Sequence, residues 1–217
     1  MATYTIKVQN ESGFGKDYVV FQKPPEVISN GSNVEVFSNA WITFTGILPG
    51  SFNSLTYEDI TYAYWGTMTS DMSSTTSITQ GGSTLVNTAT QDGVAFQADD
   101  YTGFGDVTTG ASSNTGSYQI SSSSDFTAKD HFVFGMSKPT NTAIPAPVAT
   151  FLAQPNDNFD IIPVVKFYVA DGSYEAGEII NVKQFSAIPA EIDFTGRSQT
   201  TATVVQQDNG VFTVEYS

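Results

Sequence analysis

Apolar residues in this chain occur in short runs, and the longest run covers residues 159–169. It is rich in β-branched and aromatic side chains, which favour strands. In an extended chain both of its faces would be apolar, as in a strand that is covered on both sides. Proline has no N–H to donate to a ladder, so Pro163 predicts a bulge or a change of partner within the run. We therefore expect residues 159–169 to form the central strand of a β-sheet core.

The rest of the chain shows the same pattern of short strands and turns. The clearest hairpin spans residues 202–216, where Asp208, Asn209 and Gly210 supply the turn. Three further pairings are expected from short separations along the chain. They join 4–8 to 18–21, 85–86 to 94–96, and 178–182 to the central strand. A single strand is expected over 55–65, with one core face and one aromatic, hydroxyl-bearing face.

This spacing of strands predicts an all-β protein with little or no helix. No stretch of about ten residues shows the helical period. About a dozen short strands with turns between them are typical of a single antiparallel two-sheet β-sandwich, jelly-roll-like or immunoglobulin-like. The cysteine pair around a tryptophan that marks immunoglobulin domains is absent, which favours a larger sandwich. No Pro/Gly/Ser-rich linker divides the chain, so residues 1–217 are expected to form one domain.

The charge of the chain limits its partners. Eight Lys and Arg residues stand against 22 Asp and Glu, a net charge of −14, and no basic residue lies between Lys23 and Lys129. Nucleic acid and anionic membranes would be repelled, so neither is expected as a partner. Solubility is the simplest reason for such a charge. Cation binding and resistance to proteases that cut after Lys or Arg are two others.

The composition also argues against an enzyme. There is no cysteine, so disulfides, thiolate chemistry and cysteine-based zinc sites are excluded. His131 is the only histidine, whereas histidine metal sites need two or more, and no Gly-x-Ser-x-Gly motif accompanies it. The sole arginine, Arg197, is expected in a turn beside an acidic neighbour. Adjacent acids such as Glu58 and Asp59 would face opposite sides of a strand, unlike the facing pair of a glycosidase.

One acidic, glycine-containing loop could supply oxygen ligands to a metal ion. Asp99, Asp100 and Asp106 surround the segment 101–105, and calcium is the ion that such carboxylates favour. The spacing differs from that of an EF-hand loop. A solvated acidic loop is therefore the alternative, and the cofactor expectation is none or calcium. Residues 156–160 form a second oxygen-rich loop, for which calcium binding and a solvated acidic loop are again the two interpretations.

Aromatic residues gather in two places next to polar ones. Tyr62, Tyr64 and Trp65 follow Asp59, and Tyr101 lies in the acidic loop. Exposed aromatic faces beside carboxylates are suited to sugar rings, so these five residues are the candidate ligand site. The same side chains are also what a strand uses for core packing. Tyr62 and Tyr64 share one face and Trp65 the other, so at least one set should be exposed unless a loop covers it.

Two classes of function remain from the sequence. The first is a non-enzymatic binding module, lectin-like, with a carbohydrate or another protein as partner. The second is a structural or self-assembling homo-oligomer that associates through sheet edges. The N-terminus has no basic region followed by an apolar one, so no signal peptide is expected. A cytoplasmic location or release by a non-classical route follows from that expectation.

Overall fold

The computed structural model describes residues 3–69, 72–73, 76–99, 101–185 and 187–217. Within them the regular structure consists of strands and two short 3-10 helices, η1 (Ala128–Asp130) and η2 (Val182–Gln184). The prediction of an all-β protein is thus confirmed. No helix in the described ranges is long and apolar enough to cross a membrane.

The strands form four sheets, where a single two-sheet sandwich was expected. Sheet I has the order β19 (Phe212–Tyr216), β18 (Thr201–Gln206), β1 (Thr3–Asn10), β7 (Phe52–Glu58). Sheet II has the order β17 (Ala190–Asp193), β16 (Lys166–Asp171), β2 (Lys16–Gln22), β6 (Ala40–Ile47). Most pairs are antiparallel, but β1 and β18 run parallel.

The other two sheets hold the remaining strands. Sheet III has the order β5 (Phe37–Ser38), β14 (Ala146–Leu152), β13 (Phe132–Lys138), β8 (Thr61–Thr67), β9 (Thr79–Val86). Sheet IV has the order β11 (Gly103–Phe104), β10 (Gly93–Gln97), β12 (Tyr118–Ser122), β15 (Asn158–Ile162), β3 (Glu26–Ser29), β4 (Ser32–Asn33). Here β10 and β12 run parallel.

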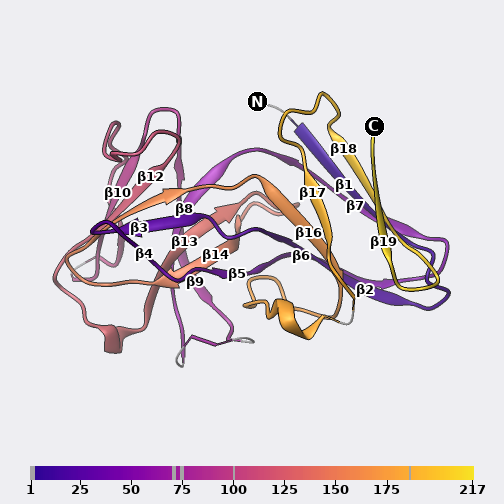
Figure 1. Ribbon diagram of the computed structural model, residues 1–217. Helices are drawn as coiled ribbons and strands as arrows, with labels where there is room; N and C mark the ends of the chain where they lie inside the picture. The colour runs from indigo at the N-terminus through magenta and orange to yellow at the C-terminus, as the bar shows by residue number, and fades with distance from the viewer. Residues whose placement is uncertain (1–2, 70–71, 74–75, 100, 186) are drawn as a thin grey trace.

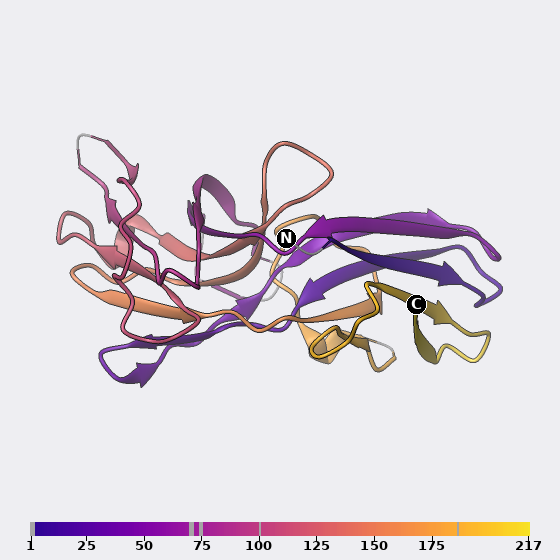
Figure 2. The same ribbon diagram turned by 90° about the horizontal axis from the view of Figure 1, so that it is seen from above.

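Sheets I and II enclose one hydrophobic core, and sheets III and IV enclose another. Trp41, Leu55 and Phe167 lie at the centre of the first core. Phe96, Phe134 and Phe159 lie at the centre of the second. We call the two halves the first lobe and the second lobe; Figures 1 and 2 show them side by side along an elongated molecule, with both termini on the first lobe. Met136 and Ala149 of sheet III belong to the first core, so the lobes share packing.

The chain crosses between the lobes four times: from β2 to β3, β5 to β6, β7 to β8, and β15 to β16. The expected central strand is the last of these crossings. Before Pro163, β15 pairs with β12 and β3; after it, β16 pairs with β2 and β17. The predicted change of partner at Pro163 is therefore confirmed, because the run serves one sheet in each lobe.

Polar side chains bridge the backbone at all four crossings. Gln22 Nε2 donates to the Val164 carbonyl at 2.6 Å, and Ser38 Oγ donates to the Gln22 carbonyl at 3.0 Å. Asn39 Nδ2 donates to the Gly177 carbonyl at 2.8 Å, and Lys138 Nζ lies 2.8 Å from Asp59 Oδ1. Since buried polar groups need partners, these contacts fix how one lobe sits on the other.

Several expected pairings are wrong, while the hairpin over 202–216 is confirmed. β1 and β2 lie in different sheets and face each other across the first core. The expected strand 55–65 breaks at Asp59–Ile60 into β7 and β8, which belong to different lobes. β9 pairs with β8, and β10 pairs with β12 and β11, so 85–86 and 94–96 are not partners. Residues 178–182 make an isolated bridge to Asn39, and β17 takes the place expected for them beside β16.

Candidate functional site

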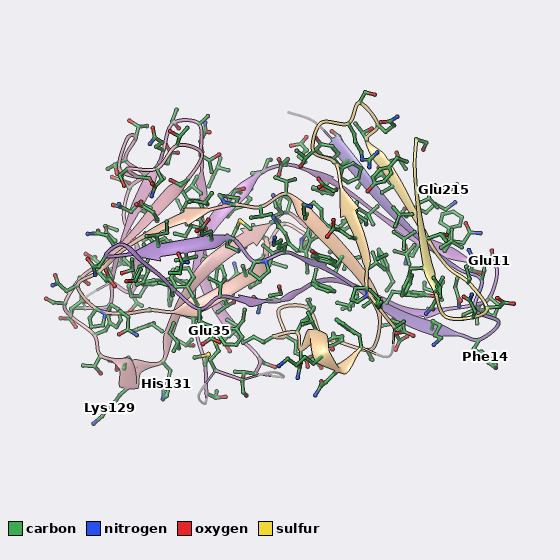
Figure 3. The ribbon with its side chains drawn as sticks, viewed as in Figure 1. Glu11, Phe14, Glu35, Lys129, His131 and Glu215 are labelled. Atoms are coloured by element: carbon green, nitrogen blue, oxygen red, sulfur yellow. The ribbon has the colours of Figure 1, made fainter. Side chains whose placement is uncertain are left out.

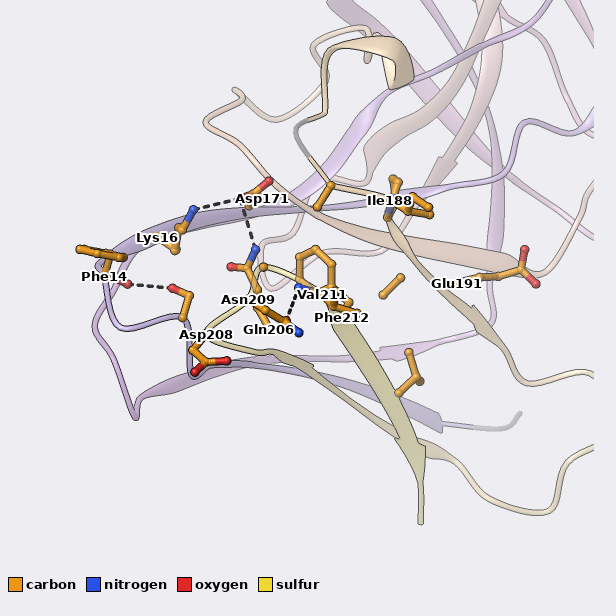
Figure 4. A pocket seen from close by; sticks show the side chains of 16 residues that line it. Phe14, Lys16, Asp171, Ile188, Glu191, Gln206, Asp208, Asn209, Val211 and Phe212 are labelled. Atoms are coloured by element: carbon orange, nitrogen blue, oxygen red, sulfur yellow. Dashed lines mark hydrogen bonds and ion pairs between the residues drawn. The ribbon is translucent and has the colours of Figure 1, made fainter.

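A cleft of about 870 Å³ lies at the end of the first lobe that is remote from the second lobe. It is formed where the turn after β1, the end of β16, the segment before β17 and the β18–β19 turn come together (Figure 4). In Figure 3, Phe14 and Glu11 project from this end, whereas His131 and Lys129 project from the second lobe. The volume is within the range of small-ligand pockets.

The floor of the cleft is a hydrogen-bonded polar network. Tyr18 Oη donates to Gln206 Oε1 at 2.9 Å, and Gln206 Nε2 donates to Asp171 Oδ2 at 3.3 Å. Lys16 Nζ forms an ion pair with the same oxygen at 3.0 Å. Burial, with the nearby Asp171 charge, raises the pKa of Tyr18 well above its usual value, so it remains a neutral donor. These hydrogen bonds and the ion pair fix the positions of the floor side chains before a ligand binds.

The rim of the cleft carries large apolar side chains that are exposed to water. Phe14 is 73% exposed, Ile188 90% and Val211 55%. Exposed apolar side chains that gather around a cavity are typical of interaction sites, whereas single ones are ordinary. Below them, the half-buried Phe212 and Val214 extend the apolar surface into the cleft.

The turn that carries Phe14 is held in place by one buried side chain. Asn10 is fully buried, and its Nδ2 donates to the Phe14 carbonyl at 2.6 Å and to the Ile47 carbonyl at 2.7 Å. Its Oδ1 accepts from the backbone N–H of Ser12 at 2.9 Å. Phe14 is thus presented to solvent by a fixed turn.

The β18–β19 turn brings a carboxylate and an amide to the other side of the rim. Asp208 and Asn209 are both exposed, and Asn209 Oδ1 accepts from the Val211 N–H at 3.0 Å. Among the described residues, the Asp208 carboxylate has no hydrogen-bond donor. The cleft therefore combines aromatic and aliphatic surface with carboxylate and amide groups.

The aromatic residues predicted from sequence do not form a shared exposed surface. Tyr64 is fully buried, packs with Met68 and Val133, and its hydroxyl hydrogen-bonds Thr150. Met68, Met72 and Ile78, which follow β8, pack against this cluster, so the Tyr64 ring does not offer an exposed face for a sugar. Trp65 is half-buried against Phe96, with ring centroids 5.4 Å apart.

The remaining predicted ligand residues are scattered. Gly81 and Gly82 of β9 lie against the Trp65 indole, and a Cβ atom added at Gly81 would come within 2.3 Å of the ring. Tyr62 is half-buried on the Tyr64 face, and Asp59 is the ion-pair partner of buried Lys138. Tyr101 is 65% exposed and lies in the loop before β11. Only Tyr101 has a largely exposed ring.

The acidic loop is organised by a different acid from those predicted. Asp125 Oδ2 accepts the backbone N–H groups of Ala98 and Asp99 at 2.9 and 3.0 Å, while Asp99 and Asp106 are exposed. Asp100 is outside the described residues. Within the part of the chain that the structure describes, no three His, Asp or Glu side chains are placed to hold a metal ion. A calcium site that includes Asp100 stays a prediction.

The second oxygen-rich loop shows the same role for its acids. Asp157 accepts from Ser29 Oγ at 2.6 Å and from Asn30 Nδ2 at 3.0 Å. Asp160 accepts from Ser112 Oγ at 2.7 Å and from Asn114 Nδ2 at 3.0 Å. These carboxylates hold neighbouring loops in place.

The residues of the cleft had only weak signals in the sequence. The sequence predicts turns at residues 10–15 and 208–210 but does not connect them, because it is the parallel pairing of β1 with β18 that brings the two turns together. The one usable signal is Phe14, a large aromatic residue within a polar, glycine-containing turn.

Comparison with known proteins gives one match. A family model described as RhiA matches residues 1–217, the whole chain. No curated protein and no solved structure matches.

Proposed function

Because the chain belongs to the RhiA family over residues 1–217, we propose a function for it as a member: a non-enzymatic binding protein that takes a carbohydrate in the cleft of the first lobe. The observation that carries the proposal is the exposed apolar rim above a fixed polar floor. A protein gains nothing in stability from Phe14, Ile188 and Val211 in water, so their position around one cleft is best explained by a ligand.

The chemistry of the cleft supports a sugar as that ligand. Sugar rings offer apolar C–H faces and directional hydroxyl groups. Phe14 provides a ring for the faces, while Asp208 and Asn209 provide acceptors and donors for the hydroxyls. Lys16 is already paired with Asp171, and Asp208 and Glu191 are acids, so an anionic ligand is disfavoured. A neutral glycan meets these conditions.

A glycan array with the purified protein tests the proposal. Burying a Phe side chain contributes about 1.5–3 kcal/mol, so Phe14→Ala should weaken binding by roughly tenfold or more. Asp208→Asn should weaken it as well, because a charged acceptor is lost. Neither variant should change the melting temperature, since both side chains are exposed.

Tyr101→Ala is the matched control, since Tyr101 is an exposed aromatic residue outside the cleft. It should bind as the parent does. An array without any selective signal from folded protein would overturn the proposal. A loss of binding in Tyr101→Ala, with Phe14→Ala unaffected, would move the site to the loop predicted from sequence.

Association through sheet edges is the second candidate function. One observation favours it: β7 and β9 are long strands that end their sheets, and together they contain a single charged residue, Glu58. Long edge strands without charges are the ones that pair with another chain.

A further inference from the structure

Among the described residues, the strand β7 has a strand partner on one side only. Its seven residues, Phe52–Glu58, pair with β1 on one side, and sheet I ends on the other. Leu55 and Tyr57 point into the first core, while Phe52, Ser54 and Thr56 are exposed. No proline interrupts the strand, and its one charged residue is at its end.

The hydrogen bonds reveal which backbone groups face the free side. Asn10 N–H donates to the Ser51 carbonyl at 3.0 Å, and the Ser54 N–H donates to the Asn53 side chain at 2.8 Å and so not to β1. In an antiparallel pair, bonded residues alternate along the strand. Ser51 and the odd residues that follow are therefore bonded to β1. The backbone groups of the even residues from Phe52 to Glu58 face outward.

This alternation makes the edge complementary to itself. We propose that a second copy of this chain pairs here, β7 against β7, antiparallel about a two-fold axis through Leu55. In that register all seven residues are paired. Phe52 lies opposite the partner's Glu58, and Ser54 lies opposite the partner's Thr56. Every outward-facing residue then meets another outward-facing residue, as a two-fold interface requires. The inference rests on the second candidate function and gives it an edge and a partner.

The charges along the edge fit the same register. Lys7 of β1 lies on the solvent face opposite Ser54, and its Nζ is 3.9 Å from the centroid of the Phe52 ring. The partner's Glu58 arrives next to this ring, so an ammonium meets a carboxylate at both ends of the interface. Two copies that each carry a net charge of −14 repel each other. The attraction between Lys7 and the partner's Glu58 opposes this repulsion locally and so favours approach through this edge.

Pairing requires one local change in each copy. Asn53 Oδ1, which accepts the Ser54 N–H, must give way to the partner's backbone carbonyl. One acceptor replaces another, so the cost is small relative to the ladder that forms. Strand addition buries a small area, so the dimer is expected to be weak and concentration-dependent.

Sedimentation velocity over a dilution series tests the dimer. Thr56→Pro removes an outward N–H that β1 does not use, and proline is tolerated at such edge positions. This variant should be monomeric at concentrations where the parent is dimeric. Thr56→Val keeps the N–H and should remain dimeric, although both variants lose the 3.0 Å contact with the Thr5 hydroxyl. Near-ultraviolet circular dichroism checks that both are folded.

A charge exchange gives an independent answer if Thr56→Pro does not fold. Glu58→Lys and Lys7→Glu should each weaken the dimer, and the double variant should restore it, because the attraction is re-formed with reversed signs. A parent that sediments as a monomer at every concentration would overturn the inference, as would a dimer that neither Thr56→Pro nor the single charge variants weaken. None of these residues lines the cleft, so glycan binding by monomeric Thr56→Pro separates this result from the proposed function.

Discussion

Lys138 shows how a single residue fixes the junction between the lobes. Its side chain is 1% exposed, and its ammonium contacts Asp59 Oδ1 at 2.8 Å and the Ile60 carbonyl at 3.4 Å. Both partners belong to the crossing from β7 to β8. A buried ammonium needs a counter-charge, and Asp59 supplies it. The Asp59 carboxylate is therefore engaged by Lys138 and not by a ligand.

The two partners of this ion pair should differ in their effect on stability. Asp59→Asn leaves the buried ammonium of Lys138 without a counter-ion, which should cost about 3 kcal/mol in the free energy of unfolding. Lys138→Met removes the buried charge with a side chain of similar length and leaves Asp59 in contact with water, so it should cost less. Urea unfolding measures both. Equal costs, or no cost for Asp59→Asn, would contradict this role.

Asp193 makes a pH-dependent contribution at the end of β17. Hydrogen bonds from Thr195 and the ion pair with Lys166 at 3.0 Å lower the pKa of Asp193 to about 2. A carboxyl whose pKa is lowered by folding stabilises the fold above its unfolded pKa of about 3.9, and the contribution is lost as the pH falls through the folded value.

Asp193→Asn should therefore melt at a lower temperature than the parent at neutral pH. The difference should shrink as the pH falls from about 4 to about 2, because the parent carboxylate becomes protonated over that interval. Thermal unfolding followed at several pH values measures it. A difference that stays constant down to the lowest pH would show that the charge of Asp193 is not what stabilises this turn.

At the scale of elements, local patterns predicted strands better than partners. The hairpin over 202–216 and the change of partner at Pro163 have local causes, a turn sequence and a missing N–H, and both could be predicted. The hairpin expected from residues 4–8 and 18–21 could not be excluded from sequence. The expected pairing does not form because β18, from near the end of the chain, pairs with β1 instead.

The candidate site could be predicted only in its general chemistry. An aromatic residue beside carboxylates does occur at the cleft, but it is Phe14, and not Tyr64 or Trp65. Periodicity placed Tyr64 and Trp65 on opposite faces, as the structure has them. It could not show that residues following β8 would cover the Tyr64 face, because that cover depends on tertiary packing.

The loop before β12 depends on a carboxylate from another strand. Asp160 of β15 accepts hydrogen bonds from Ser112, Ser113, Asn114 and Gln119, at 2.7 to 3.2 Å. Loops of this composition have few apolar contacts, so such bonds provide much of their order.

Asp160→Ala should therefore speed amide hydrogen exchange in residues 112–117 by roughly tenfold, with the protection of the second core unchanged. Hydrogen-exchange mass spectrometry measures this segment directly. Asp157→Ala is the matched control, since Asp157 holds Ser29 and Asn30 and should leave residues 112–117 as they are. Unchanged exchange in Asp160→Ala would mean that the loop is ordered by other contacts.

In the whole molecule, both proposed functions belong to the first lobe but use different parts of it. The cleft lies at the outer end of the first lobe, and β7 runs from that end toward the second lobe. Antiparallel pairing of β7 would place the two clefts at opposite ends of a dimer. Single-site sugar affinity is expected to be weak, because hydroxyl groups exchange water for protein partners with little net gain. Two sites on one particle would raise the avidity.

Heteronuclear NMR titration of the isotope-labelled protein would locate the bound glycan directly. A glycan selected on the array should shift amide signals in the segments 12–16, 187–191 and 206–212, which contribute most of the residues that line the cleft. Signals of β8 and of the loop with Tyr101 should not move. Shifts confined to Tyr62, Trp65 or Tyr101, with the cleft signals unchanged, would contradict a binding site in the cleft.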